Sequence, residues 1–172
     1  MKIVLVGYMT SGKSTIGRLL AEKKNFSFID LDNYIEEKEE MSVSEIFETK
    51  GEIYFRKQEH LYLKEILTLK NDIILALGGG TPCYASNMDV IKDSINTVAV
   101  YLKASITTIA TRLTTEKSQR PLVARLKNDE LAEFVAKHLF ERSYFYNQSN
   151  YKITVDDKKT DIIVTELNAL LR

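Results

Sequence analysis

A glycine-rich stretch near the start of the chain, GYMTSGKS at residues 7–14, has the residue types and spacing of a phosphate-binding loop. In such a loop the backbone N–H groups cradle phosphates, the lysine reaches the β- and γ-phosphates, and the last hydroxyl takes a position on Mg²⁺. The pattern therefore predicts a site for a nucleoside triphosphate with Mg²⁺. Its candidate residues are Gly7, Thr10, Ser11, Gly12, Lys13, Ser14 and Thr15.

Two carboxylates form a second candidate group, in the sequence FIDLD at residues 28–32. Asp30 is a candidate to hold Mg²⁺ through water, together with Ser14, because Mg²⁺ gives up its waters reluctantly. Asp32 is a candidate to accept a hydrogen bond from an acceptor hydroxyl and to orient that hydroxyl for in-line attack. The alternative for Asp32, which the sequence leaves open, is a cap on the following helix.

Glycines and arginines make up the remaining candidates. The consecutive glycines Gly78–Gly80 suit a backbone that comes close to a ligand, although a flexible turn would also use them. Arg56, Arg120 and Arg142 carry guanidinium groups that can clamp a carboxylate or a phosphate. For Arg56 the alternative is an exposed surface pair with Glu59, three residues further on.

The pattern of apolar residues indicates how these groups are positioned. Five apolar runs predict strands that alternate with helical stretches, which is typical of an α/β fold with a parallel sheet covered on both faces. The loops 7–14, 30–32 and 78–80 each follow a strand, so we expect them to meet at the carboxyl edge of the sheet. A closing helix is predicted over 161–171. The predicted strands are Ile3–Val6, Phe26–Ile29, Ile73–Leu77, Thr97–Leu102 and Tyr151–Val155.

Two segments depart from this simple alternation. Residues 33–70 are long and helical in pattern, and are predicted to form an insertion large enough for a small subdomain. Residues 114–127 are polar, basic and interrupted by Pro121. That stretch is either a lid that closes over bound phosphates or a solvated connector. His60 and His138 lack the spacing of metal ligands and are assigned no role.

The composition is that of a single domain of 172 residues, in which 24 basic residues balance 24 acidic ones. This balance argues against a nucleic acid or a membrane surface as partner, and no apolar stretch approaches the roughly 20 residues that cross a bilayer. Cys83 is the only cysteine, so no intrachain disulfide is possible. The first predicted strand leaves no room for a signal peptide. We therefore expect a cytoplasmic protein.

Taken in order, these motifs resemble the shikimate kinase family over nearly the whole chain. The matching pieces are GYMTSGKSTIGRLLA, FIDLD, SVSEIFETKGEIYFRKQE, LGGG, RPL at 120–122 and the pair Arg142 and Tyr146. The resemblance implies a three-layer P-loop kinase fold with a five-stranded parallel sheet flanked by helices. It also implies a substrate-binding subdomain at 33–61 and a lid at 113–125 within one domain, 1–172. The implied activity is ATP-dependent phosphorylation of the 3-hydroxyl of shikimate, with Mg²⁺, by a monomer.

The same resemblance implies roles for individual residues. Catalysis would fall to Lys13, Asp32 and Arg120, with Arg120 on the ATP phosphates and Arg112 near the adenine. Thr10 departs from the family, which usually has glycine there, and a β-branched residue is strained if that position needs a positive φ. Shikimate would contact Asp32, Arg56, Gly78, Gly79, Gly80 and Arg142.

Other functions remain as alternatives at this stage. A related P-loop kinase acting on gluconate or a nucleoside monophosphate would use the same phosphate loop. A nucleotide-dependent switch is less favoured, because the guanine-reading N-K-x-D pattern does not occur in the chain.

Overall fold

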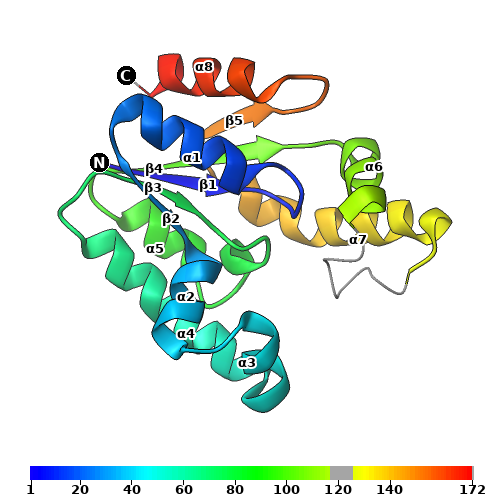
Figure 1. The fold of residues 1–172 in the computed structure, drawn as a ribbon, viewed down its shortest axis with the longest axis horizontal. Coiled ribbons are helices and arrows are strands. Elements are labelled where there is room, and N and C mark those ends of the chain that lie inside the picture. The colour runs from blue at the N-terminus through cyan, green and yellow to red at the C-terminus, as the bar shows by residue number, and fades with distance from the viewer. Residues whose placement is uncertain (117–125, 172) are drawn as a thin grey trace.

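The computed structural model describes residues 1–116 and 126–171. Its centre is a parallel sheet of five strands in the order β2-β3-β1-β4-β5 (Figure 1). The predicted five-stranded parallel sheet is thus confirmed, and each predicted strand lies within two residues of its observed bounds. The strands are β1 (Lys2–Val6), β2 (Ser27–Asp30), β3 (Ile73–Ala76), β4 (Thr97–Lys103) and β5 (Tyr151–Thr154).

Helices cover both faces of the sheet and give the molecule three layers. Figure 1 shows α1 and α8 together on one face, while α4, α5 and the end of α7 lie on the other. The helices are α1 (Lys13–Lys24), α2 (Leu31–Glu39), α3 (Val43–Thr49), α4 (Gly51–Thr68), α5 (Asn87–Asp93), α6 (Ile106–Glu116), α7 (Asn128–Tyr146) and α8 (Thr160–Leu170), with a 3₁₀ turn η1 at Thr81–Cys83.

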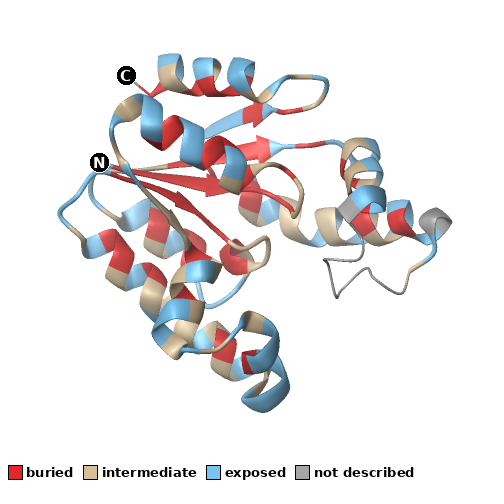
Figure 2. Ribbon diagram, viewed as in Figure 1, coloured by how far each residue is buried: buried red, intermediate tan, exposed pale blue. Residues whose placement is uncertain are grey.

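The core lies along the central strands. Every residue of β1 and β3 is buried (Figure 2), as expected of parallel strands that are covered on both faces. The predicted closing helix is confirmed as α8, which buries Ile163, Val164 and Leu167. Burial on both sides fixes the strand ends, and therefore the loops that follow them, in a rigid frame.

Residues 33–61 lie in α2, α3 and the first half of α4, which extend beyond the edge of the sheet (Figure 1). A capping box starts α3, because the Ser42 hydroxyl accepts from Glu45 N at 3.2 Å and Glu45 Oε2 accepts from Ser42 N at 2.8 Å. Glu39 of α2 accepts hydrogen bonds from Tyr54 at 2.7 Å and Tyr62 at 2.8 Å on α4. These hydrogen bonds join α2 to α4, and Glu36 Oε1 of α2 accepts from Val43 N at the start of α3 at 2.8 Å.

The predicted lid, 113–125, lies mostly outside the described residues, and Arg120 lies outside them altogether. Within the described ranges, none of the helices combines the length and the apolar character that a membrane span requires.

Candidate active site

The phosphate loop connects β1 to α1 and turns sharply at its end. Gly12, with a φ of 92°, precedes the first residue of α1, and Thr10 has a φ of 60°. The conformation that would strain a threonine at position 10 is therefore present. Lys13 turns its ammonium group back over the loop and donates to the carbonyls of Gly7 at 2.8 Å and Tyr8 at 2.9 Å.

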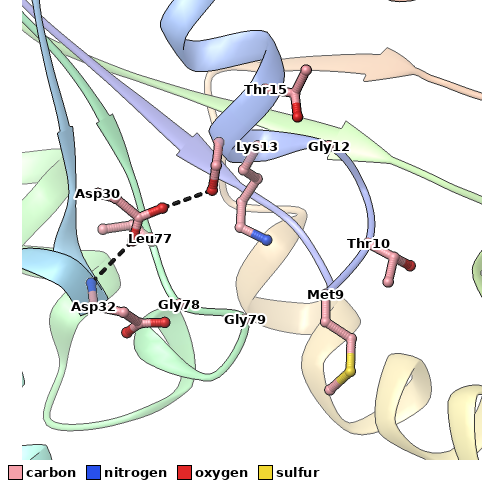
Figure 3. Close-up of a pocket in the computed structure, with 11 residues that line it drawn as sticks. Met9, Thr10, Gly12, Lys13, Thr15, Asp30, Asp32, Leu77, Gly78 and Gly79 are labelled. Atoms are coloured by element: carbon pink, nitrogen blue, oxygen red, sulfur yellow. Dashed lines mark hydrogen bonds between the residues drawn. The ribbon is translucent and has the colours of Figure 1, made fainter. Parts of the chain in front are cut away.

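A cavity of about 200 Å³ opens where the loop meets the ends of β2 and β3 (Figure 3). Thr10, Gly12, Lys13, Ser14 and Thr15 of the predicted nucleotide-binding residues line it, whereas Gly7, Ser11 and Arg112 do not. Ser11 is buried beneath the loop, with only 1 % of its surface exposed. The lining residues are Met9, Thr10, Gly12, Lys13, Ser14, Thr15, Asp30, Asp32, Leu77, Gly78 and Gly79.

Asp30 joins the phosphate loop to the second strand. The Ser14 hydroxyl donates to Asp30 Oδ2 at 2.6 Å, and Asp30 Oδ1 accepts from Asp32 N at 3.2 Å (Figure 3). Asp30 is thus the N-cap of α2, and the alternative in which Asp32 caps this helix is wrong. The cap falls one residue before the helix because Asp30 still has the extended backbone of β2.

The chemistry of these oxygens fits Mg²⁺. Ser14 and Asp30 offer a hydroxyl and a carboxylate beside the phosphate loop, and Mg²⁺ binds through one or two such groups plus phosphate oxygens and waters. Among the described residues there is no cluster of three or more His, Cys, Asp or Glu that would form an all-protein metal cage. The donor set therefore suits an ion that arrives with its nucleotide.

Asp32 is in an unusual electrostatic setting for an aspartate. Burial raises its pKa from 3.8 to about 6, and the negative charges of Asp30 and Glu59 act in the same direction. Lys13 and Arg56 oppose this rise. An unshifted aspartate is a feeble base, whereas a carboxylate with a pKa near neutrality accepts a proton more readily.

The glycine triplet brings the predicted acceptor-binding residues together. A Cβ atom on Gly78 would lie 3.0 Å from Asp32 Oδ1. A Cβ atom on Gly79 would lie 3.4 Å from a terminal nitrogen of Arg142. A Cβ atom on Gly80 would lie 2.9 Å from a terminal nitrogen of Arg56. Each glycine therefore gives room to one of these three side chains. The turn after β3 is where groups from α2, α4 and α7 converge.

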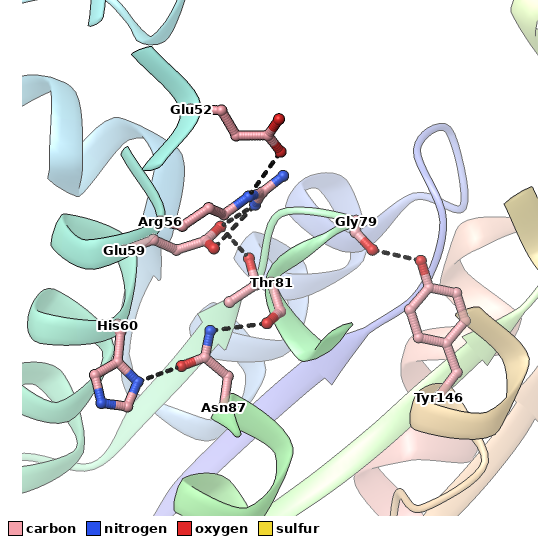
Figure 4. A network of polar contacts seen from close by, with 8 residues as sticks. All are labelled: Glu52, Arg56, Glu59, His60, Gly79, Thr81, Asn87 and Tyr146. Atoms are coloured by element: carbon pink, nitrogen blue, oxygen red, sulfur yellow. Dashed lines mark hydrogen bonds and ion pairs between the residues drawn. The ribbon is translucent and has the colours of Figure 1, made fainter. Parts of the chain in front are cut away.

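Arg56 is held by carboxylates and by an aromatic ring. One terminal nitrogen lies 3.1 and 2.9 Å from the two oxygens of Glu59, and its Nε lies 3.5 Å from Glu52 (Figure 4). The guanidinium carbon lies 4.0 Å from the centre of the Tyr84 ring. Glu59 is only 1 % exposed, so the alternative of an exposed surface pair is wrong.

Arg142 approaches the same turn from α7. Its guanidinium lies over the Tyr8 ring at 5.3 Å, and the Tyr146 hydroxyl of the same helix donates to the Gly79 carbonyl at 2.5 Å. The Tyr8 hydroxyl and His138 Nδ1 are 3.0 Å apart. The last turns of α7 are thereby fixed to both the phosphate loop and the glycine turn.

Arg112 on α6 contacts the phosphate loop directly. Its guanidinium donates to the Thr10 carbonyl at 2.9 Å, so the structure places it beside the loop.

Several residues of the site escaped the sequence reasoning. Glu59 is predicted only as a surface partner of Arg56, although it is the last residue of the family-matching piece SVSEIFETKGEIYFRKQE. Thr81 donates to Glu59 Oε1 at 2.7 Å, and Asn87 donates to the Thr81 carbonyl at 2.8 Å. No pattern in the sequence distinguishes Thr81 or Asn87, because their importance comes from contacts with α4.

Comparison with known proteins identifies the family. Residues 9–172 match the sequence profile of the family described as shikimate kinase. A shikimate kinase of Flavobacterium psychrophilum is 52 % identical over 171 residues, which cover 99 % of this chain and 98 % of the relative.

Solved structures agree with this assignment. A shikimate kinase of Bacteroides thetaiotaomicron superposes with a TM-score of 0.92 at 35 % identity, covering 99 % of this chain and 98 % of that one. A shikimate kinase of Acinetobacter baumannii in complex with shikimate superposes with a TM-score of 0.87 at 30 % identity, covering 99 % and 92 %. Because the family profile matches residues 9–172 and a relative is 52 % identical over 98 % of its length, this chain belongs to the shikimate kinase family.

Proposed function

We propose that this chain transfers the γ-phosphate of ATP to the 3-hydroxyl of shikimate, which gives ADP and shikimate 3-phosphate, a step towards chorismate and the aromatic amino acids. The observation that carries the proposal is the glycine turn. Gly78–Gly80 make room for Asp32, Arg142 and Arg56 in turn, directly beside the phosphate loop. A carboxylate next to two guanidinium groups suits a small polyhydroxy acid better than it suits a nucleobase.

Arg56 and Arg142 hold the carboxylate of shikimate in this proposal. Guanidinium groups bind carboxylates through paired hydrogen bonds, which fix orientation as well as position. Arg56 is already anchored by Glu59 and by the Tyr84 ring, so little of its conformational freedom remains to be lost on binding. Gly79 and Gly80 let the ring of the substrate approach the backbone.

Asp32 orients the acceptor hydroxyl and takes its proton. A new bond forms between the hydroxyl oxygen and the γ-phosphorus, and the bond from that phosphorus to the β,γ-bridging oxygen breaks. The proton of the hydroxyl passes to Asp32, whose raised pKa suits this task. The loose transition state of phosphoryl transfer needs positioning more than it needs a strong base.

Ser14 and Asp30 would hold Mg²⁺, and the ion supplies neutralisation of negative charge on the phosphates. Lys13 moves from the carbonyls of Gly7 and Tyr8 to the β- and γ-phosphates, while the backbone of the loop binds their oxygens. The proposal also assigns Arg112 to the adenine and Arg120, which lies outside the described residues, to the ATP phosphates. Helices within 33–61 form the shikimate-binding subdomain.

The proposal also includes a monomeric chain in the cytoplasm. The lone Cys83 leaves no intrachain disulfide and suits a reducing compartment, and the balance of basic and acidic residues argues against a nucleic acid or a membrane surface as partner.

The test is an assay of ADP release by the purified chain with ATP and Mg²⁺. Shikimate should stimulate release strongly, while gluconate and nucleoside monophosphates should leave it at the background rate. Mass spectrometry of the product should find shikimate with one added phosphate. Folded protein whose ADP release responds to another acceptor in the panel, and not to shikimate, would contradict the proposal.

A further inference from the structure

A series of buried polar side chains, Glu59, Thr81 and Asn87, connects Arg56 to α5 (Figure 4). Glu59 is 1 % exposed, and Thr81 and Asn87 are both fully buried. Polar side chains are costly to bury unless they form hydrogen bonds. Each of these side chains is hydrogen-bonded to the next residue in the series, so together they form one connected network.

The centre of the network is the hydroxyl of Thr81. It donates to Glu59 Oε1 at 2.7 Å, and the same oxygen accepts from Arg56 at 3.1 Å. The second oxygen of Glu59 accepts from the same Arg56 nitrogen at 2.9 Å. The threonine hydroxyl therefore determines how the carboxylate is turned, and the carboxylate in turn positions the guanidinium.

Thr81 is itself held from two sides. Its N–H donates to the Gly78 carbonyl at 3.1 Å, and its carbonyl accepts from Asn87 Nδ2 at 2.8 Å. Since the amide nitrogen of Asn87 is used in this way, its oxygen accepts from His60 Nδ1, 2.7 Å away on α4. The turn that carries Thr81 is thus connected to the helix that carries Arg56 by two separate routes.

We infer that Thr81, held in place by Asn87, is a positioning residue that fixes the Arg56 guanidinium for the carboxylate of the acceptor. The inference rests on the proposed function, because it assigns Thr81 to the acceptor half of the site and not to the nucleotide half. Without the hydroxyl, Glu59 Oε1 keeps only Arg56 as a partner among these residues. The carboxylate then turns, and the guanidinium turns with it, away from the position beside Gly80.

The decisive variant is Thr81→Val, which keeps the shape of the side chain and removes the hydroxyl. We expect KM for shikimate to rise about tenfold, the effect of losing one hydrogen bond to a charged group. KM for ATP and kcat should stay within about twofold, because binding alone is weakened. Thr81→Ser, which restores the hydroxyl, should return KM for shikimate close to the wild-type value.

A matched control is Thr68→Val at the far end of α4, where an exposed threonine hydroxyl donates only to the Glu65 carbonyl. This control should leave all three kinetic constants unchanged. Thr81→Val should also be coupled to Arg56→Ala. When Arg56 is already alanine, Thr81→Val should add little further loss of shikimate affinity. Should Thr81→Val fold poorly, Thr81→Ala serves for the same comparison.

The outcomes separate the inference from the function on which it rests. A wild-type chain without shikimate-dependent ADP release would overturn the proposed function and this inference together. An active wild type, with KM for shikimate unchanged in Thr81→Val, would overturn the inference alone. Equal rises in KM for shikimate and for ATP would also overturn it, since a general loosening of the fold would then explain the effect.

Discussion

The carboxylate of Asp32 shows how one residue can be suited to chemistry at the expense of stability. Its pKa is raised from 3.8 to about 6, first by burial and then by Asp30 and Glu59. At neutral pH the side chain is therefore ionised in a place that disfavours its charge. A group with a raised pKa in the folded state lends stability only while it is protonated.

Asp32→Asn should consequently stabilise the chain while it abolishes phosphoryl transfer. At about pH 8 we expect a gain of about 1–3 kcal/mol in the free energy of unfolding, because the pKa of Asp32 rises from 3.8 to about 6 on folding. The gain should shrink as the pH falls through about 6, and vanish below about 4, where the aspartate is protonated in both states. Urea unfolding at several pH values measures this, and an Asn variant less stable than wild type at pH 8 would contradict it.

Thr10 carries strain that a glycine would relieve. Its φ of 60° is unfavourable for a β-branched residue, and its hydroxyl is buried without a hydrogen-bond partner among the described residues. Thr10→Gly should raise the free energy of unfolding by about 0.5–1 kcal/mol, because relief of about 1–2 kcal/mol exceeds the entropy that glycine loses.

A control for this change is Thr15→Gly, at an exposed position within α1, which should lower the free energy of unfolding by about 0.3 kcal/mol, because threonine is itself a weak helix former. Denaturant titration compares the two variants. If Thr10→Gly is destabilised as much as Thr15→Gly, the loop stores no strain at this position.

Sequence patterns located these residues but not their surroundings. The phosphate loop was predictable because its glycines and lysine act through local backbone geometry. The pKa of Asp32 and the burial of Glu59 were not, since both depend on contacts between α2, α4 and the turn after β3. The alternative of Asp32 as the cap of α2 is wrong because Asp30, at the same junction, has the extended backbone of a cap residue.

Among the elements, the turn after β3 is the one on which the acceptor site depends. Gly80 has an ordinary helical φ of −89°, so an alanine there is compatible with the backbone. Its Cβ, however, would meet a terminal nitrogen of Arg56 at 2.9 Å and push the guanidinium aside.

Gly80→Ala should therefore raise KM for shikimate about tenfold or more, with stability within about 1 kcal/mol of wild type. The end of the Arg56 side chain yields more easily than the backbone does, even though Glu59 and Tyr84 hold it. Steady-state kinetics with each substrate varied in turn, together with thermal unfolding, tests both parts. A variant with normal KM for shikimate would show that Arg56 does not need its present position.

The elements themselves were largely predictable. Uninterrupted apolar runs predicted the strands because β1 and β3 are covered on both faces, and buried strands need no alternation. Residues 33–70 were predicted to be a helical insertion, but the sequence pattern did not predict where one helix ends and the next begins. Its division into α2, α3 and α4 depends on local features such as the capping box of Ser42 and on the contacts of Glu39 with Tyr54 and Tyr62.

On the scale of the whole molecule, strand order places the two halves of the site side by side. Because β1 and β3 are neighbours in the sheet, the phosphate loop after β1 lies against the glycine turn after β3. Asp30, the last residue of β2, and Asp32, in the first turn of α2, lie at the end of the strand next to β3 and line the same cavity. Phosphoryl transfer therefore requires two adjacent but separable binding sites in this molecule, one for the nucleotide and one for the acid.

Calorimetric titration of two variants with both ligands tests that requirement most directly. Lys13→Ala should lose most of its affinity for ATP while it keeps its affinity for shikimate, and Arg56→Ala should do the reverse, each by about tenfold or more. Equal losses of both ligands in either variant, from protein that unfolds at the wild-type temperature, would contradict the account.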